Sequence, residues 1–263
     1  MISFIIVNFN TAEITKDCIS SLLSNTSDKD REIIIIDNAS VDDSPAILNA
    51  AFGGAIKLIS NQNNLGFATA NNIGARAAKG DILFFLNSDT IVGSDIIGPI
   101  IKALDNQKLG IVAPVLLLAD GQKQPFAYGR FPRLASVIFN KVLAFDCSRI
   151  AGQLKLVDWV SGAALAIRKS VFEKIGGWDE RFFLYFEDVD FCWRAKQRGF
   201  EIAVLESISI VHLGGRSLVK SRERKKQYYL AQEYFFRKNY GAVSANILKI
   251  MRWPYIMIKI LTR

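Results

Sequence analysis

The sequence predicts an α/β protein with a mostly parallel sheet and helices on both of its faces. In the first half of the 263-residue chain, short apolar runs rich in β-branched residues alternate with segments of helical periodicity. The runs are apolar throughout, which is typical of parallel strands buried on both faces. Half of the residues are hydrophobic, so the chain can bury one large core or two small ones.

The first half of the chain contains the clearest elements. Its first two strands end in Asn8 and Asp37, and a third apolar run, over 81–86, leads into polar residues. The first helix is well marked, because Asn10 stands at the N-cap and Glu13 follows in the capping-box position. The expected strands are 2–8, 31–37, 55–59, 81–86 and 109–113, and the expected helices are 11–25, 44–51, 66–78 and 94–105.

The second half is less regular. Prolines and glycines interrupt 114–135, which predicts a long loop. An apolar run predicts a strand over 155–168, and a helix is expected from Glu187 to Arg198. Further strands are expected at 200–205 and 207–211, followed by a charged helix over about 218–239 and a basic, amphipathic tail.

Charge and cysteine content limit the partners and the cellular compartment that we expect. The net charge of +8 and the pI of about 9.4 favour anionic partners such as nucleotide diphosphates, nucleic acid or an acidic membrane surface. No motif of RNA- or DNA-binding proteins is present, so we expect no nucleic acid. The three cysteines are far apart, which predicts neither a disulfide framework nor a zinc site and favours a reducing cytoplasm.

Targeting segments are not expected either. Residues 1–7 are apolar but have no basic segment and no cleavage site, so they are interpreted as a strand and not as a signal peptide. No stretch approaches the roughly 18 apolar residues that a membrane-spanning helix needs.

Polar residues follow several of the expected strands. Asn8 and Asn10 follow the first strand, Asp37 ends the second, and Asn87-Ser88-Asp89 follows strand 81–86. The carboxyl ends of parallel strands meet at one edge of a sheet, so these residues should line one crevice. Asp37 has two interpretations: its side chain caps the following turn, or it accepts a hydrogen bond from a base or ribose.

Two segments of the sequence have the kind of residues that hold a ligand. Asn64, Phe67 and Asn71 belong to a turn that enters a helix, where the asparagines cap the helix or help to hold an anionic or polar ligand. Asp89 stands after an unusually apolar strand, a pattern typical of a carboxylate holding a divalent cation that bridges phosphate oxygens.

A cluster of acids adjoins an aromatic segment. Glu187, Asp188 and Asp190 follow 177–186, and carboxylates in such surroundings need a cation, a proton or a substrate as partner. On a helix, either Asp188 points inward alone or Glu187 and Asp190 do so together. The structural alternative is a set of acids favoured by the helix dipole, with Asp190 paired to Arg194.

His212 is the only histidine of the chain. It follows a strand and precedes two glycines, so it is either a structural residue or a metal ligand or proton carrier. Other chemistries lack their motifs. No G-x-G fingerprint, phosphate-binding loop or G-x-S-x-G elbow occurs, which argues against dinucleotide redox chemistry, NTP hydrolysis and serine hydrolysis.

Taken in order, these segments resemble family 2 glycosyltransferases, and most of all the rhamnosyltransferase-like branch that builds bacterial surface polysaccharides. The resemblance covers about residues 1–215 and is specific as an ordered set. It rests on Val7-Asn8-Phe9-Asn10, Ile36-Asp37-Asn38-Ala39-Ser40, Asn63-Asn64-Leu65-Gly66-Phe67-Ala68 with Asn71-Asn72, Asn87-Ser88-Asp89, Trp159-Val160-Ser161-Gly162-Ala163 and Phe186-Glu187-Asp188-Val189-Asp190.

The resemblance implies a GT-A (Rossmann-like) fold over 1–215, with a nucleotide-binding half (1–113) and an acceptor and catalytic half (114–215), plus a C-terminal helical extension (216–263). It also implies a nucleotide-sugar donor, Mg²⁺ or Mn²⁺, and inversion at the anomeric carbon. Asn87 replaces the first Asp of the family's D-x-D element, which removes a charge from the expected metal site.

The resemblance also assigns roles to residues. Asp37 would hold the pyrimidine, Asp89 and His212 the metal, and Asp188 would be the general base. The residues expected at the donor are Asn8, Asn10, Asp37, Asn64, Phe67, Asn71, Asn87, Ser88 and Asp89, and those expected at the acceptor and catalytic pocket are Trp159, Ser161, Gly162, Glu187 and Asp190.

The basic end of the chain has two interpretations. Its cations and apolar residues are either a solvated face with a core stripe, or an interfacial helix over 245–263 that rests on anionic head groups. The second suits a polyprenyl-linked acceptor and a peripheral location on the cytoplasmic face of the plasma membrane.

We therefore expect an inverting glycosyltransferase that moves a sugar from a dTDP- or UDP-sugar, with rhamnose as the best guess, to a glycan or lipid-linked acceptor. One alternative is a non-catalytic nucleotide-binding or scaffold subunit, which only Asn87 supports. A nucleotidyltransferase is a second alternative, but the glycine-rich basic loop that it needs after the first strand is absent.

Overall fold

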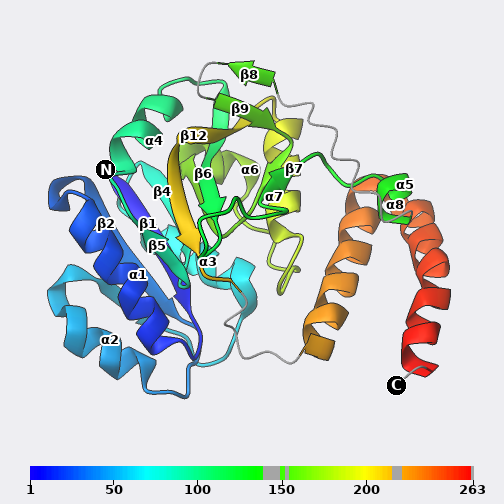
Figure 1. Ribbon diagram of the computed structural model, residues 1–263, viewed down its shortest axis with the longest axis horizontal. Coiled ribbons are helices and arrows are strands. Elements are labelled where there is room, and N and C mark those ends of the chain that lie inside the picture. The colour runs from blue at the N-terminus through cyan, green and yellow to red at the C-terminus, as the bar shows by residue number, and fades with distance from the viewer. Residues whose placement is uncertain (139–148, 152–153, 215–220, 262–263) are drawn as a thin grey trace.

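A mixed β-sheet forms the centre of the molecule (Figure 1). The computed structural model describes residues 1–138, 149–151, 154–214 and 221–261, with side chains up to Arg252 in the last segment. In these residues the strand order is β3-β2-β1-β4-β11-β6-β12-β9-β8, with β5 also paired to β12. The strands are β1 (Ile2–Asn8), β2 (Arg31–Asp37), β3 (Lys57–Ser60), β4 (Ile82–Asn87), β5 (Thr90–Val92), β6 (Leu109–Leu117), β8 (Arg149–Ala151), β9 (Leu154–Val157), β11 (Ala164–Arg168) and β12 (Glu201–His212), and β7 (Tyr128–Gly129) pairs with β10 (Trp159–Val160) separately.

Helices cover both faces of this sheet. They are α1 (Ala12–Asn25), α2 (Ser44–Phe52), α3 (Gly66–Ala77), α4 (Ile97–Leu104), α5 (Leu134–Ile138), α6 (Lys169–Ile175), α7 (Glu187–Gln197) and α8 (Ser221–Leu261). Buried residues of α1, α2 and α4 share one core with one face of the sheet, and those of α3, α6 and α7 share another with the opposite face. Neighbouring strand residues divide accordingly: Phe84 lies in the first core and Phe85 in the second. The expected α/β fold is confirmed.

The parallel pairing brings the polar strand ends together. Strands β3, β2, β1 and β4 are mutually parallel, with Asn8 opposite Asp37 and Val7 opposite Asn87. Strand β11 then runs antiparallel between β4 and β6, and β12 returns parallel to β6. The polar residues that end β1, β2 and β4 (Asn8, Asp37 and Asn87) therefore lie together at the carboxyl ends of the parallel strands.

Several predictions for the second half were wrong in detail. The expected loop over 114–135 contains the end of β6, all of β7 and the start of α5. The expected strand over 155–168 is three short strands, because β9, β10 and β11 pair with different neighbours. The two strands expected between 200 and 211 are one strand, β12, with a shift in register between Leu205 and Ser209. Helix α6 and strand β5 were not predicted.

The expected N-cap of the first helix was also wrong. Thr11, and not Asn10, precedes α1. Asn10 has a left-handed φ of 55°, and its side-chain oxygen accepts the backbone N–H of Val41 at 2.7 Å. The side chain therefore holds the loop that follows β2, a tertiary contact that the capping pattern did not reveal.

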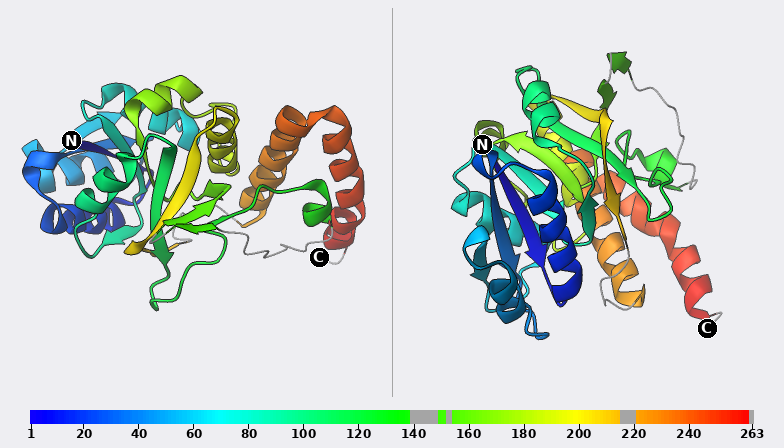
Figure 2. Two further views of the ribbon diagram at one scale, coloured as in Figure 1. Left: turned by 90° about the horizontal axis from the view of Figure 1, so that it is seen from above. Right: turned by 60° about the vertical axis from the view of Figure 1, so that its left-hand side comes forward.

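Helix α8 is the expected C-terminal helical extension. At Gly241, φ 87° and ψ 167° interrupt the helix, and its two halves fold back as a hairpin beside the sheet domain (Figures 1 and 2). Phe235 and Phe236 of the first half bury with Ala245 and Leu248 of the second, so part of the tail packs as core. Among the described residues, we find no helix long and apolar enough to cross a bilayer.

Candidate active site

The first element of the site is the turn after β2. The amide of Asn8 donates to Oδ1 of Asp37 at 2.7 Å and to the Ser40 hydroxyl at 3.0 Å. The backbone N–H of Ser40 donates to Oδ2 of Asp37 at 3.0 Å. Asn8 and Asp37 are buried. The turn-capping interpretation of Asp37 is thus confirmed, and the caps fix the carboxylate at the strand edge.

A second loop, between β3 and α3, lies beside this turn. Asn64 accepts an amide hydrogen of Asn38 at 2.8 Å and the backbone N–H of Gly66 at 3.0 Å. Phe67 donates its backbone N–H to the carbonyl of Phe183 at 2.9 Å. Gly66 has φ 80°, and a Cβ there would meet the Phe183 carbonyl oxygen at 2.6 Å, so only glycine fits.

Asn71 takes no part in this crevice edge. Its amide donates to the carbonyl of Phe67 one turn earlier at 3.0 Å, and it is buried within α3. The neighbouring Asn72 ties α3 to the segment that precedes α7, through paired hydrogen bonds of 2.9 Å with the backbone of Trp178.

The third element is the end of β4, where Asp89 and His212 meet. Nε2 of His212 lies 3.1 Å from Oδ1 of Asp89 and 3.4 Å from the amide nitrogen of Asn87. The two come together because β5 pairs with the end of β12, placing His212 opposite Thr90. Ser88 lies beside them, with its hydroxyl 3.4 Å from that of Thr11.

These groups match part of the ligand set of a divalent cation. Asp89 and His212 are both largely buried, with 17% and 13% of their side chains exposed. In the described part of the chain, no cluster of three or more His, Cys, Asp or Glu side chains could hold a metal alone. Mg²⁺ is commonly bound by one or two carboxylates together with substrate phosphates, so a carboxylate, an imidazole and the Asn87 amide form a suitable partial set.

The fourth element is Asp188, in the first turn of α7. Its Oδ2 accepts the backbone N–H of Gly162 at 3.0 Å, and its Oδ1 accepts that of Val189 at 2.8 Å. Tyr185 and Phe186, which lead into the helix, both have left-handed φ angles, 72° and 63°. Burial raises the pKa of Asp188, against the effect of the two N–H donors.

Glu187 and Asp190 flank Asp188 in the first turn of α7. Both are buried, and one carboxyl oxygen of Glu187 has no hydrogen-bond partner among the described residues. Burial, together with the charge of Asp188, raises the pKa of Glu187 well above its ordinary value. Of the two arrangements considered for a helix, Glu187 and Asp190 are the more buried pair, while Asp188 keeps some exposure.

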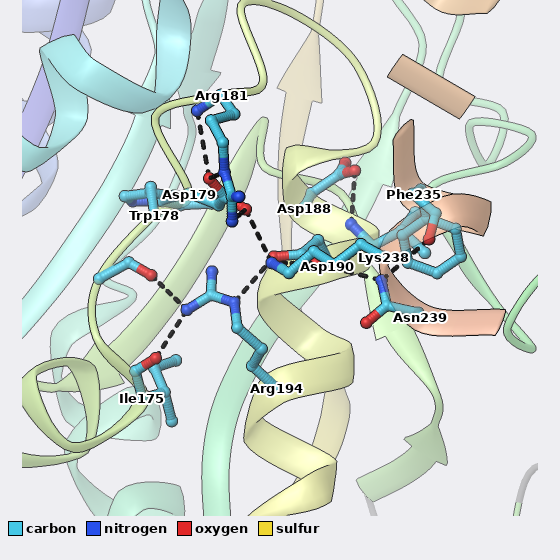
Figure 3. Close-up of polar contacts among 12 residues, drawn as sticks. Ile175, Trp178, Asp179, Arg181, Asp188, Asp190, Arg194, Phe235, Lys238 and Asn239 are labelled. Carbon is cyan, nitrogen blue, oxygen red and sulfur yellow. Dashed lines mark hydrogen bonds and ion pairs between the residues drawn. The ribbon is translucent and has the colours of Figure 1, made fainter. Parts of the chain in front are cut away.

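Asp190 anchors α7 to α8 (Figure 3). Its carboxylate pairs with Arg194 at 2.8 Å and with Lys238 at 2.7 Å. Lys238 also pairs with Asp179 at 2.8 Å, which further accepts the Tyr234 hydroxyl at 2.9 Å. The Asp190–Arg194 pair considered from the sequence is therefore present, and it faces the helix hairpin.

Residues 159–163 connect Asp188 to the strand-end cluster. Gly162 donates to Asp188, and the carbonyl of the next residue, Ala163, accepts the backbone N–H of Asn87 at 2.8 Å. A Cβ on Gly162 would lie 3.3 Å from Phe67 and 3.5 Å from Asp188, so Phe67 and Asp188 flank the same glycine. Ser161 supports this turn by accepting the Ala163 N–H, and Trp159 donates to the Arg130 carbonyl at 3.0 Å.

Two residues at the site were missed from the sequence. Gln124 contacts His212 at 2.7 Å from a segment expected to be a featureless loop. Thr15 donates its hydroxyl to the side-chain oxygen of Asn8 at 2.7 Å from within α1. Neither stands in a recognisable motif, so only the folded chain brings them to the site.

Comparisons with known proteins agree with this geometry. The model of the glycosyl transferase family 2 matches residues 3–176. A low-salt glycan biosynthesis hexosyltransferase, Agl10, of Haloferax volcanii is 23% identical over 99% of this chain and 84% of its own. An N-acetylglucosaminyl-diphospho-decaprenol L-rhamnosyltransferase of Mycobacterium tuberculosis is 27% identical over 72% of this chain and 69% of its own.

A solved structure shows the same fold. The mannosyltransferase PcManGT of Pyrobaculum calidifontis, determined in complex with GDP-Man and Mn²⁺, aligns with a TM-score of 0.65 at 17% identity, over 90% of this chain and 63% of that one. The expected GT-A-like arrangement is therefore confirmed. Since the family model matches more than half of the residues, the chain belongs to glycosyl transferase family 2.

Proposed function

We propose that this glycosyltransferase moves a sugar from a pyrimidine-diphosphate donor, a dTDP- or UDP-sugar, to a hydroxyl of a glycan or polyprenyl-linked acceptor, with inversion. Rhamnose is the proposed sugar, because a rhamnosyltransferase acting on a lipid-linked acceptor is among the relatives. One observation carries the proposal: consecutive residues, Gly162 and Ala163, tie the Asp188 carboxylate to the strand end that bears Asp89.

The donor lies along the strand edge in this proposal. Asp37 accepts a hydrogen bond from the pyrimidine, and Asn8 and Asn10 shape the turn around it. Asn64 and Phe67 line the second loop, while Asn71 supports the helix start from within α3. This assignment is supported by the caps that already fix the Asp37 carboxylate and the Asn64 side chain.

Asp89 and His212 would hold Mg²⁺ or Mn²⁺, with Asn87 and Ser88 beside it. A bound cation stabilises the negative charge that develops on the leaving diphosphate. Asp89 supplies the carboxylate and His212 a neutral nitrogen ligand. Because Asn87 carries no charge, the donor's own phosphates contribute more to holding the cation than they would beside two carboxylates.

Asp188 acts as general base. The acceptor hydroxyl gives its proton to the carboxylate as its oxygen forms the new bond to the anomeric carbon, while the bond to the diphosphate breaks on the opposite face. A positioned base of this kind contributes typically 10²–10⁴-fold to the rate. Gly162 N–H orients the carboxylate, and a raised pKa makes it a stronger base than an exposed aspartate.

The other residues expected at the acceptor pocket have supporting roles. Ser161 and Trp159 hold the turn around Gly162, and buried Glu187 adjoins the base. Asp190 anchors α7 on α8 through Lys238. We propose that α8 rests on the cytoplasmic face of the plasma membrane, because one face of its second half exposes apolar residues. These are Val243, Ile247, Ile250 and Met251.

Donor binding is tested first, by the thermal shift of the protein with UDP, dTDP, GDP and CMP, each with and without Mn²⁺. A ligand at about 100 times its dissociation constant adds roughly 2.7 kcal/mol of stability. We expect a Mn²⁺-dependent shift with dTDP or UDP. A shift with GDP alone would contradict the pyrimidine assignment, and no shift with any nucleotide would favour a scaffold subunit.

The base is tested by Asp188→Asn. This change should lower turnover by at least about 10²-fold while the thermal shift with the nucleotide stays as in the wild type, because the amide cannot accept the proton. Wild-type turnover in this variant would show that another group is the base.

A further inference from the structure

Aromatic side chains join the helix hairpin of α8 to the segment that leads into α7. The ring centroid of Tyr228, in the first half of α8, lies 5.3 Å from that of Phe186 and 5.8 Å from that of Tyr185. Phe186 is the residue that precedes α7, so it is two residues from Asp188. Tyr228 is 41% exposed, and its side chain is therefore accessible to a ligand close to the proposed base.

The Tyr228 hydroxyl lies within electrostatic reach of both a guanidinium and a carboxylate. Burial raises the pKa of this hydroxyl, the charge of Arg252 lowers it, and the charge of Asp188 raises it. Arg252 belongs to the second half of α8 and Asp188 to α7. These three side chains are therefore neighbours only because the hairpin folds back beside the domain.

The Arg252 guanidinium lacks hydrogen-bond partners. Its Cζ lies 5.0 Å from the centre of the Tyr229 ring, a cation–π contact that uses none of its N–H groups. Nη2 is buried without a hydrogen-bond partner among the described residues. The charge of Glu233 acts on Arg252, but the ion pair that Glu233 forms is with Arg237, at 3.5 Å. A buried donor of a charged group is costly to leave unpaired, so a bound anion would explain it.

A second arginine of α8 lies near the same aromatic side chains. Arg224 precedes Tyr228 by one turn, which places both on one side of the helix. Burial raises the pKa of the Tyr185 hydroxyl, and the charge of Arg224 opposes that rise. No carboxylate in the part of the chain that the structure describes forms an ion pair with Arg224 or Arg252. From Ser221 to Arg252 the chain has eight Lys and Arg residues and two Glu residues, so this region is strongly basic.

We propose that Arg252, Arg224 and the Tyr228 hydroxyl bind the diphosphate of a lipid-linked acceptor and so hold the acceptor near Asp188. The planar guanidinium matches the geometry of phosphate oxygens, and two arginines with a hydroxyl suit two linked phosphates. The exposed side chains of Ile250 and Met251 directly precede Arg252 and would lie along the lipid chain. The role as acceptor site rests on the proposed function, whereas diphosphate binding to the hairpin can be measured without a donor.

Geranyl diphosphate is a soluble probe of this subsite. Calorimetry on the full chain is done without a divalent cation, so that the probe does not bind through the candidate metal site. We expect the wild type to bind geranyl diphosphate much more tightly than geraniol, which has the same chain and no phosphate. Equal binding of the two, or no binding of geranyl diphosphate, would overturn the proposal.

Variants test whether these residues hold the diphosphate. Arg252→Gln and Arg224→Gln should each weaken binding of geranyl diphosphate about 10-fold or more, because each removes charge-assisted hydrogen bonds. The two positions lie in different halves of the hairpin, so the test does not depend on one of them tolerating the change. Tyr228→Phe keeps the ring contacts and should weaken binding several-fold. Lys249→Gln removes an exposed cation one turn before Arg252 and is the matched control. An equal loss in Lys249→Gln would mean that only overall charge matters, and would overturn the proposal.

Phospholipid head groups have the same phosphate chemistry, and vesicles distinguish them from the acceptor. Sedimentation with vesicles of phosphatidylcholine and phosphatidylglycerol should fall no further in Arg252→Gln than in Lys249→Gln. A larger fall, matching the loss of geranyl diphosphate binding, would assign the arginine to the membrane and overturn the proposal. The thermal shift with nucleotide and Mn²⁺ should be the same in these variants as in the wild type. If no nucleotide shifts the wild type, the proposed function fails, while calorimetry still decides whether the hairpin binds a diphosphate.

Discussion

Asp188 and Glu187 are buried carboxyls, and burying their negative charge lowers the stability of the folded protein. Burial raises the pKa of both carboxyls, so each is easier to ionise in the unfolded chain than in the folded one. Above the folded pKa this difference destabilises the fold, and the effect disappears as the pH falls below the unfolded pKa. Burial raises the pKa of the Tyr228 hydroxyl of α8, and the charge of Asp188 adds to that rise.

We therefore predict that Asp188→Asn raises the melting temperature at pH 8 and that the gain vanishes near pH 3, because the variant removes the cost of burying the carboxylate charge. About 2–4 °C is expected for each kcal/mol in a protein of this size. The measurement is a melting curve at each pH for the variant and the wild type. Asp120→Asn, at an exposed turn, is the control. A variant that melts lower than the wild type at pH 8 would contradict the argument from burial.

Asn87 is the other informative residue, because it stands where a second carboxylate is expected. Asn87→Asp should tighten Mn²⁺ binding about 10-fold or more, since a charged oxygen ligand replaces an amide. Calorimetric titration with Mn²⁺ measures the change, and Asp89→Asn should show the opposite effect. If Asn87→Asp leaves the affinity unchanged, Asn87 does not face the cation.

At the scale of elements, α7 and α8 are joined by ion pairs in a buried setting. The Asp190 carboxylate is fully buried, and Lys238 bridges it to Asp179 (Figure 3). The Lys238 and Arg181 side chains hold the pKa of Asp179 well below its usual range, against the effect of burial. Helix α8 thereby neutralises the acids Asp179 and Asp190 through Lys238.

Lys238→Met should destabilise the protein by about 3 kcal/mol, because it leaves two carboxylates with one partner fewer in a low-dielectric setting. The estimate lies at the lower end for a broken buried pair, since Arg194 still pairs with Asp190. Arg237→Met removes a neighbouring cation whose partner, Glu233, is more exposed and should cost less than about 1 kcal/mol. Denaturant unfolding measures the free energy of unfolding of both variants. Equal decreases in the two would argue against a role for burial of the ion pairs.

The same elements show which parts of the fold could be predicted from the sequence. Strands β1, β2 and β4 are continuous apolar runs with polar ends, so both their position and the edge bearing Asp37 and Asp89 followed from local pattern. Strand β12 was divided in two at Glu206, a charged residue that interrupts its apolar run. Pairing with β6 and β5 on either side of the interruption keeps it one strand.

The contacts that complete the site are tertiary and had no local signal. Gln124 reaches His212 only because a hairpin extends β6, and Lys238 reaches Asp190 only because α8 folds back on the domain. Sequence patterns also could not decide between Glu187, Asp188 and Asp190, since helical spacing allows two arrangements. The acids were recognised, but the direction of each side chain depended on its neighbours.

At the scale of the whole molecule, the helix hairpin has two different sides. One packs on the domain through Phe235 and Phe236, which share a core cluster with Val189 of α7, and another exposes Ile250 and Met251. The chain as a whole carries a charge of +8. An apolar strip on a basic protein is typical of a helix that lies in the head-group region of an anionic membrane.

We predict that the protein co-sediments with vesicles containing anionic phospholipid and less with neutral vesicles, and that Ile250→Glu combined with Met251→Glu reduces this binding at least several-fold. Two acidic residues would replace apolar contacts and repel the anionic head groups. Glu substitution at Val41, an exposed apolar residue near β2, is the matched control and should bind as the wild type does. The thermal shift with nucleotide should be the same in all three proteins, because the donor edge lies on the sheet. Equal sedimentation of the wild type and the double variant would mean that this strip does not contact lipid, and that it packs against another protein surface or remains in water.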